Sequence, residues 1–278
     1  MHKTILNTIS LGIMQGRLSP KKIGYLQTFP YTQWRDEFCR ANELGFKFIE
    51  WLVDEGDWLD NPLSDLGLME EIKLIALKNN IKIETLCAHF LINNHLLLPI
   101  ENINTQNSIL KLNTVIDHAY SIGISDINIP FCEIEDIIFN INKYIYLKKN
   151  LNEINNKCFF NLELSLSSIE ILKLINYLNN DKINICYDIG NAFFLGYNII
   201  SDFKILKQYI RVIHIKDRRI NGDSVDLGEG DTPIIAFLNF AIESGYSGKF
   251  TLETPVFPSW INCIKNNINF LKTINNIK

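Results

Sequence analysis

The sequence predicts a (β/α)₈ barrel in a single domain, and three observations support this fold class. Eight short apolar runs, rich in β-branched and aromatic residues, alternate with segments whose apolar residues recur at helical spacing. The runs end at intervals of roughly thirty residues, which is the length of one βα unit of a parallel sheet. The 278 residues, of which 47% are hydrophobic, suffice for one such barrel and its core.

The eight expected strands are short and mostly apolar, as strands covered on both faces by helices are. They are Ile9–Gly16, Phe46–Val53, Ile81–His89, Asp126–Phe131, Phe159–Leu164, Ile183–Gly190, Ile210–Asp217 and Lys249–Thr254.

The segments between these runs supply the helices. After the first strand, Trp34, Phe38, Ala41 and Leu44 recur at helical spacing, and Gly45 ends that helix. The other expected helices are Met69–Lys78, Asn107–Ile122, Ile134–Asn155 in two pieces, Ile169–Leu178, Phe203–Tyr209, Pro233–Ser244 and Trp260–Ile274.

A doubly wound open sheet is the alternative architecture. It usually has fewer strands and carries a glycine-rich phosphate-binding fingerprint directly after the first one. Gly12 and Gly16 do not have the Gly-x-Gly-x-x-Gly spacing of that fingerprint, so the barrel is the preferred prediction.

Composition limits the function classes. The net charge of −4 gives no electrostatic reason to expect a nucleic-acid partner. No apolar run is long enough to span a bilayer, and Ile5–Met14 is not followed by a small-residue cleavage site, so we expect no signal peptide. The six cysteines form no Cys-x-x-Cys pair, which indicates reduced, buried thiols. We therefore expect a cytoplasmic protein that acts on a small molecule and binds no membrane.

Four successive expected strands each end with one potential metal ligand: Glu163, Asp188, His214 and Glu253. Taken singly, each acid could instead cap a helix. Because functional residues of such barrels lie at the carboxyl ends of the strands, we expect the four side chains to converge on one divalent metal. Three carboxylates and one imidazole suit Mn²⁺, Co²⁺ or Mg²⁺ better than a structural zinc.

Further polar residues accompany the strand ends. Glu50 is an acid among apolar neighbours, which is costly to bury without a role. His89 ends the third strand and is either a substrate contact or a hydrogen-bonded core histidine. Lys216, Arg218 and Arg17 could hold a phosphate or a carboxylate, or could form a solvated basic rim.

The ordered set Glu163, Asp188, His214 and Glu253 resembles the xylose-isomerase-like TIM-barrel superfamily, and within it the sugar phosphate isomerases and epimerases. Several short segments fit the same resemblance, which covers nearly the whole chain. They are Gly12–Pro20, Ile49–Trp51, Tyr187–Asn191, His214–Asp217 and Leu227–Asp231.

The resemblance implies a Mn²⁺ site at those four residues, with Co²⁺, Mg²⁺ or Zn²⁺ as alternatives. It also implies that Glu163 and Glu253 are catalytic: one removes a proton next to a carbonyl, and the other returns it through a metal-stabilised enediolate. The protein would then be a metal-dependent isomerase or epimerase of a small sugar, keto-sugar or sugar phosphate, as a homodimer or a homotetramer. The expected substrate contacts are Glu50, His89, Asn191, Lys216, Arg218 and Arg17.

Two positions depart from the pattern of the ketose 3-epimerases. Asn191 stands where they usually carry a histidine, three residues after the aspartate. Ile169, with Glu170 beside it, stands where they usually carry a second glutamate. These departures bear on that particular activity and leave the four expected ligands unchanged.

Three alternative functions stay open. A dehydratase of a keto-sugar or keto-inositol would use the same enediolate but expel a β-hydroxyl group. A DNA-repair enzyme like endonuclease IV, which shares this barrel, would need more histidine and acid ligands and a basic face, whereas this chain is acidic and has five histidines. The departure at Asn191 motivates the third alternative, a non-catalytic sugar-binding barrel.

Overall fold

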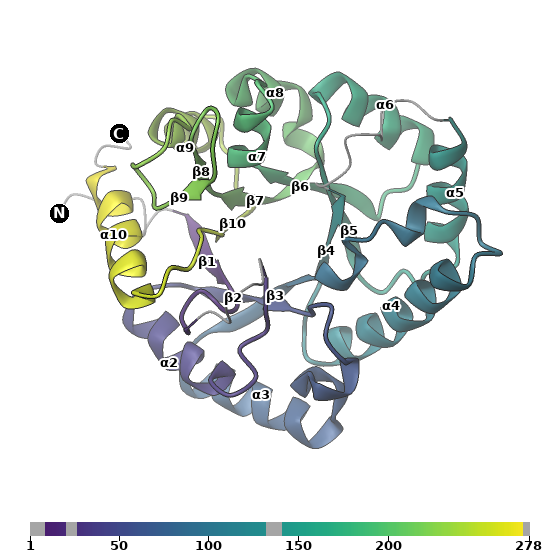
Figure 1. Ribbon diagram of the computed structural model, residues 1–278, viewed down its shortest axis with the longest axis horizontal. Coiled ribbons are helices and arrows are strands. Elements are labelled where there is room, and N and C mark those ends of the chain that lie inside the picture. Colours follow the sequence, from purple (N-terminus) through teal and green to yellow (C-terminus); the bar gives the residue numbers. More distant parts are fainter. Residues whose placement is uncertain (1–8, 21–26, 132–140, 275–278) are drawn as a thin grey trace.

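The structure is a computed structural model that describes residues 9–20, 27–131 and 141–274. Eight parallel strands close into a barrel in the order β1-β10-β7-β6-β5-β4-β3-β2, and helices surround it (Figure 1). This architecture confirms the predicted fold class.

All eight runs predicted as strands form barrel strands, and the differences are confined to their ends. The strands are β1 Ser10–Met14, β2 Phe48–Leu52, β3 Lys82–Cys87, β4 Asp126–Phe131, β5 Phe159–Leu164, β6 Ile183–Asp188, β7 Ile210–Ile215 and β10 Lys249–Leu252. A small antiparallel pair, β8 Asp217–Arg218 and β9 Ser224–Val225, lies in the loop after β7 and was not predicted.

The helices lie on the outside of the barrel (Figure 1). The α-helices of the described residues are α2 Trp34–Glu43, α3 Leu66–Lys78, α4 Ile103–Ser121, α5 Ile141–Asn152, α6 Ser168–Leu178, α7 Ile189–Phe194, α8 Ile199–Leu206, α9 Ile234–Glu243 and α10 Trp260–Thr273. The 3₁₀-helices are η1 Trp58–Asp60, η2 Pro62–Ser64, η3 His89–Leu91, η4 His95–Leu97 and η5 Lys207–Tyr209.

Local capping explains where the helices differ from the prediction. Helix α4 begins before the predicted Asn107 because the side chain of Asn102 accepts a hydrogen bond from the backbone N–H of Asn104 at 2.9 Å. The helix predicted over 203–209 is present, but α8 begins earlier, at Ile199, and η5 continues to Tyr209; the short helix α7 that precedes it was not predicted. Of the helical region predicted from 134 to 155, residues 134–140 lie outside the described part.

The interior of the barrel holds a polar layer as well as an apolar core. The buried residues Asn128 and Asn161 face each other in register on β4 and β5, and the Asn161 amide donates to Asn128 Oδ1 at 2.8 Å. Asn128 in turn donates to Glu50 Oε1 at 2.7 Å. Because buried polar groups cost free energy unless they are hydrogen-bonded, this connected chain permits an acid inside the barrel.

Asp217 organises the loop that follows β7. Its carboxylate accepts hydrogen bonds from the backbone N–H groups of Gly228, Gly230 and Thr232 at 2.8, 3.1 and 3.2 Å. A Cβ atom added at Gly230 would lie 2.2 Å from Asp217 Oδ1, so the close approach requires glycine. The glycine- and acid-rich segment is thus a loop closed around one carboxylate.

Gly230→Ala should therefore destabilise the protein by about 1–3 kcal/mol, the usual cost of overpacking a tight site. Gly222→Ala, in the same loop, is the control, because its added Cβ would meet only the Arg219 side chain at 3.3 Å. Urea unfolding of both variants measures the difference. Equal midpoints for the two variants would contradict this account of the loop.

Five of the six cysteines lie in the described residues, and all five are free thiols. Cys39 is exposed, contrary to the expectation of buried thiols, whereas Cys87, Cys158, Cys186 and Cys263 are buried. In the part of the chain that the structure describes, no helix has the length and apolar character needed to cross a bilayer.

Candidate metal centre

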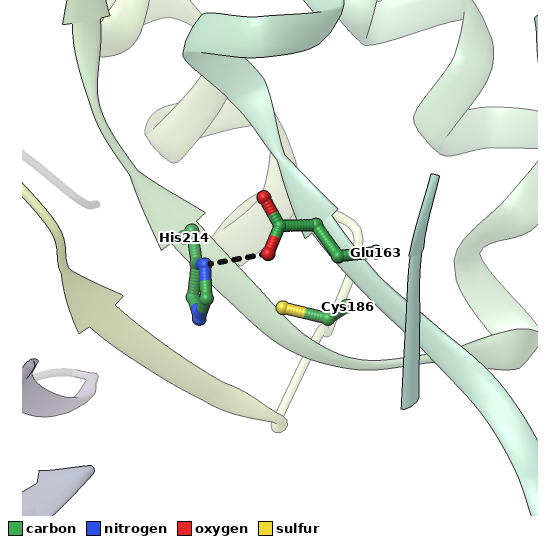
Figure 2. A group of neighbouring side chains, drawn as sticks. All are labelled: Glu163, Cys186 and His214. Atoms are coloured by element: carbon green, nitrogen blue, oxygen red, sulfur yellow. Dashed lines mark ion pairs between the residues drawn. The ribbon is translucent and has the colours of Figure 1, made fainter. Parts of the chain in front are cut away.

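The four side chains predicted as metal ligands meet inside the carboxyl end of the barrel. One ligand atom from each of Glu163, Asp188, His214 and Glu253 lies within 4.8 Å of the ligand atoms of the other three. His214 Nδ1 is 3.0 Å from Glu253 Oε2 and 3.7 Å from Glu163 Oε2, and Figure 2 shows the second of these ion pairs. The four side chains therefore converge at the carboxyl ends of their strands, as the sequence predicts.

The atoms of this group fit a divalent cation. All four residues are buried, with His214 0% exposed. Asp188 Oδ2 and Glu253 Oε2 face Lys216 Nζ at 2.7 and 3.1 Å, and His214 Nδ1 faces Glu253 Oε2 at 3.0 Å. The carboxylate oxygens thus already gather around one positive charge, and a cation bound between them could also take the lone pair of His214 Nδ1.

Glu50 lies beneath His214 and holds its far nitrogen. The two carboxylate oxygens are 3.1 and 3.3 Å from His214 Nε2. They also accept hydrogen bonds from Asn128 at 2.7 Å, Thr251 at 2.8 Å and Thr85 at 3.3 Å. Because a carboxylate only accepts, Nε2 must carry the proton, which directs Nδ1 toward the acids as a ligand.

The placement of Glu50 corrects the prediction that it contacts substrate. The side chain is 0% exposed and is not part of the cavity lining. Glu50 reaches the centre of the barrel from the second strand, but both of its carboxylate oxygens accept hydrogen bonds from residues below the site. Glu50 therefore positions His214.

Glu50→Gln should weaken Mn²⁺ binding by about 10–100-fold, the usual effect of removing a partner that orients a metal ligand. In either orientation of the glutamine amide, its NH₂ group would replace an oxygen that now accepts hydrogen bonds. An NH₂ group next to Nε2 would favour the His214 tautomer with the proton on Nδ1, which cannot bind a metal through that nitrogen. Titration calorimetry with Mn²⁺ measures the affinity, and the exposed Glu55→Gln is the control. Unchanged affinity in Glu50→Gln would remove this positioning role.

Lys216 lies beside only one of the two glutamates, and the pKa values of the two carboxyl groups therefore differ. Its Nζ lies 2.7 Å from Asp188 Oδ2 and 3.1 Å from Glu253 Oε2. Burial opposes the charge of Glu253, but Lys216 and His214 outweigh it and hold the pKa of this carboxyl well below its usual range. Burial raises the pKa of Glu163 to about 7, and the charges of Glu253 and Asp188 add to that increase. Glu253 therefore stays ionised, whereas Glu163 can exchange a proton near neutrality.

Asn191 connects Glu163 to Arg218. Its backbone N–H donates to Asp188 Oδ1 at 2.9 Å, and its side-chain amide donates to Glu163 Oε1 at 3.4 Å. Arg218 donates to Asn191 Oδ1 at 3.1 Å, and its guanidinium stacks 3.6 Å above the ring of Phe194. The position at which the epimerases carry a histidine thus holds an amide that bridges an acid and a cation.

Arg17 and Gln27 approach Glu253 from the loop after β1. The amide of Gln27 donates to Glu253 Oε1 at 2.5 Å, and Arg17 Nη2 donates to Gln27 Oε1 at 2.9 Å. Arg17 Nη2 also lies 3.5 Å from Glu253 Oε1. Sequence analysis missed Gln27, since it lies in a polar loop where no spacing or strand end indicates it.

Glu37 is a second residue that sequence analysis missed. This buried acid of α2 accepts hydrogen bonds from the backbone N–H groups of Gly16 and Leu18 at 3.0–3.1 Å. Those two residues flank Arg17, so Glu37 fixes the turn that presents the guanidinium. An acid among the apolar residues of the predicted helix was the only signal that could have indicated it.

A cavity of about 430 Å³ opens above this group, within the usual range for a small-molecule site. Of the predicted site residues, those that line it are Arg17, His89, Glu163, Asn191, Lys216, Arg218 and Glu253. Gln27, Cys87 and Asp223 contribute further polar atoms. Asp188 and His214 are not part of the lining and lie buried beside it.

Comparison with known proteins finds a family that resembles the carboxyl-terminal part of the barrel. Residues 149–274 match the model of the family described as xylose isomerase-like TIM barrel. This part of the chain, from helix α5 to α10, is therefore similar to that family, and the described chain as a whole has the (β/α)₈ barrel fold. Among curated proteins, no significant match was found.

Solved structures resemble this barrel over almost its whole length. D-psicose 3-epimerase with D-tagatose from Clostridium cellulolyticum H10 is 13% identical at a TM-score of 0.72, with 96% of each chain covered. The probable 3-DHS dehydratase AsbF from Bacillus anthracis is 13% identical at 0.71, covering 97% of this chain and 100% of its own. The IolI protein with a bound zinc atom is 16% identical at 0.70, covering 96% and 98%. At these identities the likeness concerns the fold alone.

Proposed function

We propose that the protein is a divalent-metal-dependent isomerase or epimerase of a small sugar, keto-sugar or sugar phosphate. The observation that carries this proposal is the convergence of Glu163, Asp188, His214 and Glu253 beside a cavity of about 430 Å³. The presence of an epimerase among the similar structures supports it.

Glu163, Asp188, His214 and Glu253 would hold the metal. The oxygen-rich donor set favours Mn²⁺, and the zinc atom in the similar IolI structure supports Zn²⁺ as the alternative. When bound, a divalent cation supplies a Lewis acid that stabilises negative charge developing on a substrate oxygen.

The two glutamates would move the proton. Glu253, ionised because Lys216 and His214 lower its pKa, is ready to accept a proton from carbon. Glu163, whose pKa is raised to about 7 in the metal-free protein, would be the acid that returns a proton to the substrate. Glu163 lies in β5 and Glu253 directly follows β10, so the two carboxylates would reach the substrate from different strands.

The remaining groups of the cavity would bind and orient the substrate. Arg17, Lys216 and Arg218 present cations that suit hydroxyl oxygens, a phosphate or a carboxylate, and His89 and Asn191 present further hydrogen-bonding groups. The Gln27–Arg17 pair also restrains Glu253, which keeps its carboxylate in a defined orientation.

Incubation of the metal-loaded protein with a panel of sugars and sugar phosphates in heavy water tests the proposal. We expect deuterium to enter the carbon next to a carbonyl, without loss of water. Metal bound to protein that exchanges no substrate proton across the panel would support a non-catalytic sugar-binding barrel and contradict the proposal.

A dehydratase of a keto-sugar or keto-inositol is the second candidate, and the similarity to the probable dehydratase AsbF favours it. Such an enzyme would remove the same proton but expel a β-hydroxyl group. The appearance of an absorbing enone in the same assay, with water lost, would select this reaction over epimerisation.

A further inference from the structure

We propose that Cys186 is a soft ligand that gives the metal centre a second coordination set, composed of Glu163, Cys186 and His214, for Zn²⁺ or Co²⁺. The inference rests on the proposed metal site and adds a residue to it. One ligand atom from each of these three buried residues lies within 4.8 Å of the other two. Figure 2 shows the sulfur directed toward the space between the His214 ring and the Glu163 carboxylate.

Strand geometry places the thiol below the acids. Cys186 and Asp188 are two residues apart on β6 and therefore share one face, with Cys186 deeper in the barrel. Across the sheet, Cys186 is in register with Glu163, and Asp188 is in register with His214. The two sets thus share Glu163 and His214 and differ in their remaining donors.

The chemistry of the two sets differs. Asp188 and Glu253 complete a hard, oxygen-rich set, whereas Cys186 supplies the sulfur donor that Zn²⁺ and Co²⁺ accept more readily than Mn²⁺ does. On coordination the thiol would release its proton to solvent and bind as the thiolate. Cys186 would then decide which metals the centre accepts.

A buried cysteine usually acts only as a small apolar residue, so the surroundings must distinguish the two roles. Cys158 illustrates the ordinary case, since its thiol lies 3.4 Å from the carbonyl oxygen of Ile124, away from any acid–histidine cluster. Beside Cys186, by contrast, the fully buried His214 directs Nδ1 toward two carboxylates, at 3.0 Å from Glu253 Oε2 and 3.7 Å from Glu163 Oε2. An imidazole, a thiol and a carboxylate gathered in one buried cluster form the kind of donor set that binds zinc.

Co²⁺ alone, added to the full-length metal-free chain, is the probe. We expect a near-ultraviolet band from thiolate-to-cobalt charge transfer in the wild type and in Asp188→Asn, because Asp188 belongs only to the oxygen-rich set. The band should disappear in Cys186→Ser, whose Co²⁺ and Zn²⁺ affinities should fall at least about tenfold while Mn²⁺ affinity stays within about twofold. Cys87→Ser is the matched control, since Cys87 lines the cavity but lies outside the cluster.

The wild-type spectrum decides the question even if Cys186→Ser fails to fold. Co²⁺ that binds stoichiometrically without the band would overturn the role of Cys186 and leave the proposed metal site standing. A band that persists in Cys186→Ser would likewise overturn it. Failure of the wild type to bind any of the three metals would overturn both this inference and the proposed function.

Discussion

Glu253→Gln is expected to leave the fold intact and to lower turnover by about 10²–10⁴-fold, the usual contribution of general acid–base catalysis. The amide can still offer an oxygen to a metal, but it cannot accept a proton from carbon. Circular dichroism and metal analysis check that structure and metal content survive, and the proton-exchange assay measures the loss.

Glu229→Gln is the matched control for this variant, because Glu229 is an exposed acid in the neighbouring loop after β7. Its activity should equal that of the wild type. Undiminished proton exchange in Glu253→Gln would remove Glu253 from the mechanism.

Glu163→Gln is expected to stabilise the metal-free protein above neutral pH. A carboxyl whose pKa is raised to about 7 on folding binds its proton more tightly in the folded state than in the unfolded state. Its contribution to stability is therefore present below the unfolded pKa of 4.5 and is lost as the pH rises to about 7. A permanently neutral amide avoids that loss, with a gain of about 1–3 kcal/mol at pH 8.

Urea unfolding of metal-free wild type and Glu163→Gln at pH 5 and pH 8 tests this expectation. Glu253→Gln is the opposite case. The pKa of Glu253 is lowered on folding, so its ionised form stabilises the fold above the unfolded pKa of 4.5. Neutralising it should destabilise the metal-free protein at pH 8. A Glu163→Gln protein that is no more stable than the wild type at pH 8 would contradict the electrostatic account of the site.

The two expectations share one physical basis. Glu163 and Glu253 lie in the same cluster, but Lys216 contacts only the second within ion-pair distance. A site that holds a proton on one acid and excludes it from the other suits transfer of a proton to and from carbon. Burying Glu163 destabilises the metal-free protein, and a bound cation would offset this loss of stability.

The sequence was most informative where a regular repeat constrains the chain. A buried parallel strand needs a run of apolar residues, and the polar residue that ends it lies at the functional rim, so the strands and the convergence of Glu163, Asp188, His214 and Glu253 could be predicted. The positions of residues that depend on local capping or on loops could not be predicted. Asp188 caps α7 through the N–H of Asn191, a helix that periodicity alone does not reveal in so short a segment.

The remaining misses have a tertiary origin. Gln27 reaches Glu253 across 226 residues of sequence, and no local pattern marks it. Glu50 was recognised as unusual, but whether it faces substrate or supports His214 depends on the donors Thr85, Thr251 and Asn128, which come from three other strands. Only the closed barrel brings these partners together.

Anomalous X-ray diffraction from crystals grown with Mn²⁺ tests the central claim most directly. We expect one strong peak per chain, within bonding distance of a carboxylate oxygen from each of Glu163, Asp188 and Glu253 and of His214 Nδ1. A peak bonded to fewer than three of these groups, or located only at other residues, would contradict the account.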